Sequence, residues 1–362
     1  MGRADGYSVG THLGGFDGFA VLRAAASMKA IGLRAGLSSS IGSLPHTDPR
    51  AAATFVLERH PKLPAAPSLP NRSGVERMIA QAAWGIAGVE VLEDGSLRVD
   101  DPSLDPRRPL ADAGILGEPF VGLRAFLGAV AGRRAPIKLQ LTGPVTLGIA
   151  LHSIGVPAAT AFAVAGAAVR ARARTLVAAA QETAPMAPLV VFIDEPGLTA
   201  AMHPGFPLDP NRTIDLVSSA LATLEPHAVT GLHCCGPADW RVVLQAGPQI
   251  LSMPTEANAE LHAGALGAFL ERGGWIAWGA VPTTGPLGTT PERLWQHLSA
   301  EWCALTQGGC DPVRLREQAL ITPACGLAGH GEAQADLVLS LTNQVARRIE
   351  TQALGMRLTV GA

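Results

Sequence analysis

The chain has 362 residues, and its 28 Lys and Arg residues against 30 Asp and Glu residues leave a formal charge of -2. This balance argues against a nucleic-acid partner bound through a basic face. Charged residues make up 16% and hydrophobic residues 48% of the chain, which excludes a largely disordered protein. The length allows either two domains of about 150 residues or one barrel of alternating strands and helices.

Neither a membrane span nor a secretory signal is expected. The longest apolar run, residues 155–169, is too short and too interrupted to cross a bilayer, and no signal-peptide pattern opens the chain. The five cysteines are odd in number and lie in the last third, unlike the disulfide framework of a secreted domain. We therefore expect a cytoplasmic protein with no nucleic-acid or membrane partner, whose cysteines bind metal or are simply buried. They are Cys234, Cys235, Cys303, Cys310 and Cys325.

Short β-rich runs alternate with longer segments of helical period along the chain. A first strand is expected to end near Ser40, an extended loop covers residues 63–72, and residues 93–96 form a hairpin turn. Further strands are expected at 137–142, 189–193, 228–232, 250–253, 275–281 and 319–322. Helices are expected at 118–132, 158–184, 212–225, 237–246, 258–272, 291–306 and 333–351. Strand and helix repeated in this way predict an α/β fold with a parallel sheet.

Residues able to do chemistry follow these strands. They are Ser43, Thr142, Gly143, Asp194, Glu195, His233, Cys234, Cys235, Glu256, Thr283, Thr284 and Cys325. In a closed parallel barrel the carboxyl ends of all strands open on one face, where such residues converge. No glycine-rich nucleotide-binding motif is present. We therefore predict a single TIM (β/α)8 barrel over residues 36–362, with residues 1–35 as an N-terminal extension that packs outside it or is partly mobile.

A zinc site is the sharpest prediction from the residues themselves. His233 and Cys235 are two apart, so on an extended strand end both side chains point to the same side, and Cys325 would arrive from another strand end. Zinc binds thiolates and imidazole in a tetrahedron, and Glu256 after the next strand is the expected fourth ligand. The alternative is that a buried imidazole and small apolar thiols only pack there; spacing leaves both open. Packing is expected for Cys234, Cys303 and Cys310.

Five motifs occur in an order and spacing that resemble a known family. They are SSSIGSLPHTDP at 38–49, LQLTGPVTL at 139–147, FIDEPGL at 192–198, H-x-C at 233–235 and PACGL at 323–327. Together they resemble the catalytic domain of cobalamin-independent methionine synthase over about residues 36–350. That superfamily also includes zinc methyltransferases acting on coenzyme M and, more distantly, uroporphyrinogen decarboxylases, all TIM barrels.

The resemblance implies roles for single residues. His233, Cys235 and Cys325 match the zinc ligands, and Glu256 is one residue off the spacing of the family's ligand Glu. The residues matched to the amino-acid substrate are Ile41, Gly42 and Ser43 at its carboxylate, Asp194 at its ammonium group, and Glu76 as a second acid. In an alternative interpretation Asp194 and Glu195 cap the helix after their strand.

The implied activity is methyl transfer to a thiol, as in 5-methyltetrahydropteroyltriglutamate–homocysteine S-methyltransferase. Zn²⁺ would lower the pKa of homocysteine or a similar thiol, and the thiolate would attack the methyl donor. Full-length family members have two barrels, and a His-Ser-Pro follows one strand where this chain has residues 282–286, Pro-Thr-Thr-Gly-Pro. His46 could move a proton in place of that histidine, beside Asp194 as the other candidate catalytic residue, or be an ordinary loop histidine.

Two alternatives stay open. Without the family's histidine, the methyl donor could be a corrinoid protein, or the acceptor another thiol. A decarboxylase of the uroporphyrinogen type would need several arginines for substrate carboxylates, and only Arg72 and Arg77 lie near the predicted rim.

Overall fold

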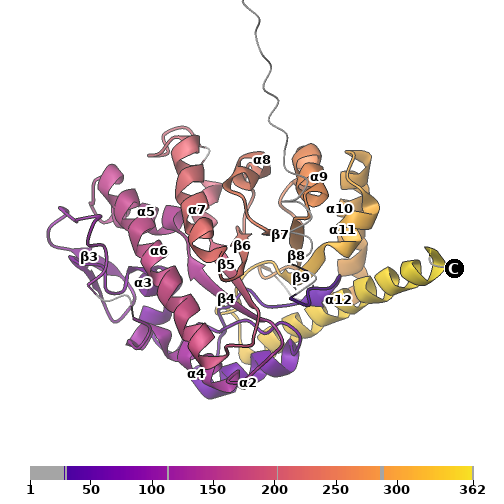
Figure 1. Cartoon of the computed structure of the whole chain (residues 1–362), viewed down its shortest axis with the longest axis horizontal. Helices are drawn as coiled ribbons and strands as arrows, with labels where there is room; N and C mark the ends of the chain where they lie inside the picture. The colour runs from indigo at the N-terminus through magenta and orange to yellow at the C-terminus, as the bar shows by residue number, and fades with distance from the viewer. Residues whose placement is uncertain (1–27, 29–30, 112–113, 202, 286–288, 361–362) are drawn as a thin grey trace, which may run out of the picture.

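The computed structural model describes residues 28, 31–111, 114–201, 203–285 and 289–360. Within them, a seven-stranded parallel sheet curls around its own interior and carries helices on its outer side (Figure 1). The strands run in the order β1, β9, β8, β7, β6, β5, β4. Their bounds are β1 (Leu37–Ser38), β4 (Ile137–Thr142), β5 (Leu189–Asp194), β6 (Val229–His233), β7 (Ile250–Pro254), β8 (Trp275–Val281) and β9 (Ala319–Pro323). The predicted α/β class and the predicted strands are confirmed.

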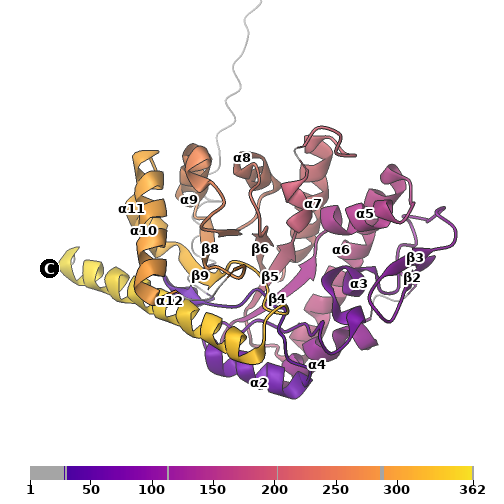
Figure 2. The ribbon, with the colours of Figure 1, turned by 180° about the vertical axis from the view of Figure 1, so that it is seen from behind.

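All the predicted helices are present, some shortened to a core of α-helix. They are α4 (Val121–Ala129), α6 (Ala158–Thr183), α7 (Pro210–Leu224), α8 (Trp240–Val243), α9 (Ala263–Glu271), α10 (Pro291–Gln307) and α12 (Glu332–Val360). The last of these runs along one end of the sheet (Figure 2). The prediction missed α2 (Pro49–Arg59), α3 (Met78–Ala83), α5 (Pro144–Ser153) and α11 (Pro312–Glu317).

The sequence contains a helix N-terminal signal for α2. The Asp48 carboxylate accepts hydrogen bonds from the backbone N–H groups of Arg50 at 2.7 Å and Ala51 at 2.9 Å, and Pro49 occupies the first helical position. Both features favour a helix N-terminus. The missed helix was therefore detectable from Asp-Pro after a polar turn.

Alternation along the strands produces two hydrophobic cores. One set of residues packs inside the curl, namely Leu37, Val190, Phe192, Val229, Ile250, Trp275, Ala277 and Leu320. The other set faces the helices, including Leu139, Val191, Leu232, Leu251 and Ile321. The inner side chains near the carboxyl ends of four strands share one row of the sheet, because Thr142 pairs with Asp194, Asp194 with His233 and His233 with Ser252. This row is the edge at which the sequence places its reactive residues.

The predicted loop at 63–72 contributes backbone pairing on two sides. Parallel bridges join Ala65 to Lys138 of β4 and Ser68 to Ser43, in the segment that follows β1. Backbone hydrogen bonds accompany them, from Ala66 N–H to the Lys138 carbonyl at 2.9 Å and from Leu44 N–H to the Ser68 carbonyl at 3.0 Å. This segment therefore lies between the two outermost strands of the sheet.

The remaining predictions concern the periphery. The hairpin at 93–96 is confirmed between β2 (Val89–Val91) and β3 (Leu97–Val99). Most of the expected extension, residues 1–27 and 29–30, lies outside the described residues. Met28 and Leu33 are buried in the inner core beside Leu37. No helix in the described part of the chain has the length and apolar character needed to cross a membrane.

Candidate metal centre

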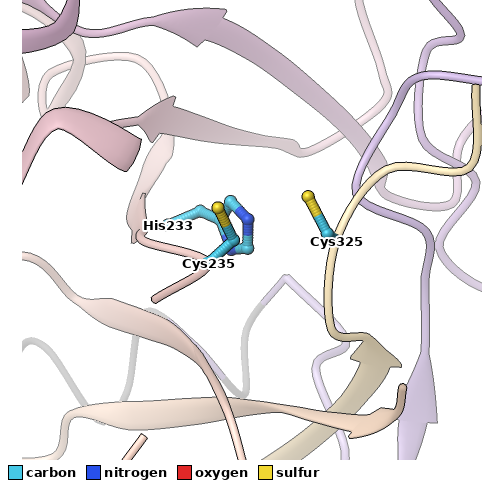
Figure 3. A group of neighbouring side chains, drawn as sticks. All are labelled: His233, Cys235 and Cys325. Carbon is cyan, nitrogen blue, oxygen red and sulfur yellow. The ribbon is translucent and has the colours of Figure 1, made fainter. Parts of the chain in front are cut away.

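Three predicted ligands come together at the carboxyl end of the sheet. One ligand atom each from His233, Cys235 and Cys325 lies within 4.8 Å of the other two. His233 ends β6 and Cys235 follows it, whereas Cys325 stands on the loop after β9, across the opening (Figure 3). Since β8 and β7 separate β9 from β6 in the sheet, it is the curl of the sheet that brings these ligands together.

The two thiols are electrostatically coupled. The pKa of Cys325 is lowered, first by a hydrogen bond from Cys235 and then by one from His233. The pKa of Cys235 is raised by the same hydrogen bond and by burial. One proton therefore stays on Cys235 while Cys325 carries the negative charge. A site that already holds one thiolate beside an imidazole is suited to a soft divalent cation.

The donor set fits zinc. Two cysteine sulfurs and one imidazole make three protein ligands, and a catalytic zinc site keeps its fourth position for a substrate or water. His233 is 4% exposed, and its Nδ1 atom lies 2.9 Å from the Ser252 hydroxyl. This contact leaves Nε2 as the nitrogen free to bind a metal.

Glu256 does not join the group, contrary to its prediction as the fourth ligand. Its carboxylate is not among the clustered ligand atoms, and its side chain is exposed between buried Thr255 and Ala257. The alternation of the turn after β7 thus directs Glu256 outward.

The other cysteines lie outside the cluster. Cys234 packs in the outer core as predicted, and burial raises its pKa to about 11. Cys310 is buried too, but Cys303 is exposed, so the prediction of a packing role for Cys303 was wrong. Its place in α10, on a side turned from the sheet, explains the difference.

Asp194 holds an unsatisfied carboxylate next to the cluster. It is paired in register with His233, and its Oδ1 atom is buried with no hydrogen-bond partner among the described residues. Burial raises its pKa, while His233 and then Lys138 act in the opposite direction. A buried carboxylate oxygen without a donor is suited to a cationic or hydrogen-bonding group of a ligand.

Glu195 has a different role from its neighbour. Its carboxylate accepts hydrogen bonds from the N–H groups of Val145 and Thr146, each at 2.7 Å, and from the Thr146 hydroxyl at 2.5 Å. It therefore caps α5, the helix after β4, and not the helix after its own strand as the alternative interpretation had it. Gly143 lies against this carboxylate with no room for a Cβ atom, so the LTGPVT and IDEP motifs interlock.

The predicted substrate-binding turn also reaches the centre. Ser43 packs with its hydroxyl against Gly326, directly after Cys325, and its carbonyl accepts a hydrogen bond from Leu327 N–H at 2.8 Å. Ile41 and Gly42 are buried behind it. This turn and the Cys325 loop are therefore in direct contact.

Glu76 and His46 are held by other contacts. The Glu76 carboxylate is fully buried, binding Arg72 Nε at 2.6 Å and Leu69 N–H at 2.8 Å. Both of its oxygens accept a hydrogen bond within the protein, and its role as a second acid for the substrate stays a prediction. His46 is buried with its ring 4.7 Å from that of Phe55. Its role in proton transfer stays a prediction.

Sequence reasoning missed three inward-facing polar residues of the sheet. Lys138 and Gln140 lie on β4, and Ser252 lies on β7. The signal for the first two was a lysine and a glutamine at alternate positions of the otherwise apolar strand IKLQL. Charged groups inside such a strand are costly and point to a specific use.

Two solved protein structures share this fold. The structure matches a B12-independent methionine synthase from Shewanella sp. W3-18-1, in complex with selenomethionine, with a TM-score of 0.57 and 14% sequence identity, over 89% of this chain and 99% of that one. A Listeria monocytogenes protein assigned to the vitamin-B12-independent methionine synthases matches with a TM-score of 0.51 and 13% identity, over 83% of this chain and 86% of that one. The chain shares its fold with B12-independent methionine synthases. No protein-family model and no curated protein matches the sequence.

Proposed function

We propose that this chain is a zinc-dependent methyltransferase that activates a thiol, homocysteine being the first candidate, for attack on a methyl donor. The convergence of His233, Cys235 and Cys325 within 4.8 Å carries this proposal. Two observations support it, namely the fold shared with B12-independent methionine synthases and the selenomethionine in the Shewanella structure. Selenomethionine is the selenium analogue of methionine, the product that methylation of homocysteine would yield.

The fold belongs to the same proposal. We infer a closed TIM (β/α)8 barrel over residues 36–362, in which residues 64–68 take the place of the eighth strand. The bridges from Ala65 to Lys138 and from Ser68 to Ser43 support this closure. A closed barrel would enclose the ligand cluster on all sides and limit its access to water.

The chemistry divides among the residues of the site. When bound by His233, Cys235 and Cys325, zinc lowers the pKa of an incoming thiol. Asp194 would accept the substrate's ammonium group on its free Oδ1 atom, and the Ile41–Gly42–Ser43 turn would hold the carboxylate. The substrate thiol gives up its proton, the thiolate forms a bond to the methyl carbon, and the bond from that carbon to the donor breaks. The donor's leaving atom keeps the electron pair, and the proton from the thiol goes to an anionic leaving group or, where the leaving group is neutral, to solvent.

The methyl donor is proposed to be a small molecule. Both structural neighbours are B12-independent by description, which gives no support to a corrinoid protein. The structural match covers 99% of the Shewanella protein, so the shared fold extends over nearly the whole length of that methionine synthase chain. His330 Nε2 lies 3.1 Å from the Thr283 carbonyl, so a histidine stands beside the segment that replaces the family's His-Ser-Pro. A cytoplasmic location stays a prediction.

The two arginines on which the decarboxylase alternative depends are not placed to bind a substrate carboxylate. Arg72 donates to Glu76 at 2.6 Å and to Glu118 at 2.7 Å, so its guanidinium is already neutralised. Arg77 is exposed. Neither provides a buried cation for a substrate carboxylate.

Metal content and turnover test the proposal together. Purified protein should contain about one zinc per chain, lost in Cys235→Ser and Cys325→Ser and retained in the control Cys303→Ser, whose thiol is exposed. The zinc-loaded protein should form methionine from homocysteine with one of methylfolate, methylcobalamin or S-methylmethionine. Metal-free protein that turns over at the same rate would refute the proposal.

A further inference from the structure

Lys138 is a buried cation without an ion-pair partner. Its side chain is 2% exposed, and no salt bridge within the described residues includes it. Its Nζ atom lies 4.7 Å from the centroid of the Phe192 ring. Burial lowers its pKa to about 8, with Asp194 opposing that shift. Burying an unpaired ammonium costs stability, so stability alone does not account for a lysine at this position.

The polar contacts of Lys138 lead to the turn before Ser43. Its Nζ atom donates to the Ile41 carbonyl at 2.7 Å and to Gln140 Oε1 at 3.3 Å. Gln140 in turn donates from Nε2 to the Ala66 carbonyl at 2.5 Å. Gly42 packs so closely on the Gln140 amide that a Cβ atom would overlap it. Lys138 and Gln140, two inward side chains of β4, therefore contact the backbone of this turn directly.

The opposite side of the turn contacts the metal-ligand loop. Ser43 touches Gly326, the residue after Cys325, and binds Leu327 N–H through its carbonyl. A displacement of residues 41–43 would therefore be transmitted to Cys325. One continuous set of contacts runs from Lys138 through Ile41 and Ser43 to this cysteine.

We propose that Lys138 is a positioning residue, which together with Gln140 fixes the Ile41–Gly42–Ser43 turn against the Cys325 loop and so sets the place of both the substrate and the Cys325 sulfur. The proposal rests on the proposed function in that the turn is taken to bind the thiol substrate. Lys138 itself does not contact the substrate, because its ammonium group is enclosed by the protein.

The test uses cobalt(II) in place of zinc, because its absorption bands report the geometry of the sulfur ligands. Lys138→Met keeps the side-chain length and removes the charge and the donors, and Lys62→Met is the control, since Lys62 is an exposed lysine paired with Glu350. We expect the cobalt bands to shift in Lys138→Met alone, with binding of homocysteine weakened about tenfold or more, as for residues that orient metal ligands. The melting temperature should stay within about 5 °C of the parent.

Three outcomes separate this inference from the proposed function. Unchanged cobalt bands and unchanged homocysteine affinity in Lys138→Met would overturn the positioning role while leaving the metal site standing. A parent protein that binds no cobalt or zinc would overturn the proposed function instead. If Lys138→Met does not fold, Gln140→Met must show the same band shift, and its absence there overturns the inference.

Discussion

His233 and Ser252 are joined across neighbouring strands, with the Nδ1 atom of the imidazole 2.9 Å from the serine hydroxyl. Both side chains are buried, and their residues are paired in register between β6 and β7. The contact at Nδ1 fixes the orientation of the ring and leaves Nε2 facing the ligand cluster. The metal-binding nitrogen is thus set by the sheet itself.

Removal of this hydroxyl should weaken metal binding. In Ser252→Ala we expect the affinity for zinc to fall about 10- to 100-fold, because the ring loses its orienting partner while all three ligands remain. Competition with a chromophoric chelator measures it. Ser299→Ala is the control, since its buried hydroxyl on α10 has no hydrogen-bond partner among the described residues. Equal affinities in the two variants would contradict the orienting role.

Cys325 should be the reactive thiol of the metal-free protein. Its pKa is lowered to about 4 by hydrogen bonds from Cys235 and His233, so it is a thiolate at pH 6, whereas Cys235 keeps its proton. Alkylation with iodoacetamide at pH 6, followed by peptide mass spectrometry, should label Cys325 well before Cys235. Added zinc should protect both. Labelling of Cys235 first would reverse the assignment of the charge.

Glu195 should make stability fall as pH rises. Burial raises its pKa from the ordinary 4.5 to about 7, against hydrogen bonds from Thr146 and Val145. Between pH 4.5 and 7 the folded state keeps a proton that the unfolded state has lost, so folding is favoured at the acidic end of this window and the advantage disappears above it. The free energy of unfolding relative to Glu195→Gln should therefore decrease by up to about 3 kcal/mol across the window.

Urea unfolding of both proteins between pH 4.5 and 8 measures this difference. His60 is present in both proteins, so its own effect cancels. That effect has the opposite sign, because burial lowers the His60 pKa to about 4 and acid must charge a buried imidazole. A difference between the two proteins that stays constant with pH would show that Glu195 is ionised throughout.

The strands were predictable from sequence because each is a short apolar run that ends in polar residues. Helix α5 was not, since PVTLGIALHS is apolar on nearly every side and six of its residues are buried, which erases the helical period. The sequence pattern predicts a loop at residues 64–68 because of Pro64 and Pro67, although the backbone of this segment pairs on both sides. Prolines at strand positions hide a strand from pattern analysis.

In the candidate site, spacing predicted the residues that belong to strand ends. His233 and Cys235 follow from alternation on one strand, and Cys325 from the common edge of a parallel sheet. The outward direction of the Glu256 side chain and the pairing of Glu76 with Arg72 are not encoded in any local pattern. Lys138 was missed because its use depends on a contact with Ile41, 97 positions away in the chain.

The interlock of Gly143 with Glu195 predicts opposite effects for two glycine-to-alanine changes. Gly143 has an ordinary φ of −82°, so an alanine there meets no backbone strain, but its Cβ would overlap the Glu195 carboxyl group. We expect Gly143→Ala to lower the free energy of unfolding by about 1–3 kcal/mol through overpacking. Gly128→Ala, at an exposed position of α4 with open space around it, should raise it by up to about 1 kcal/mol, because alanine favours a helix. Urea unfolding of both variants checks the pair. A Gly143→Ala protein as stable as the parent would mean that Glu195 can leave the α5 cap without loss, and with it the reason that the two motifs occur together.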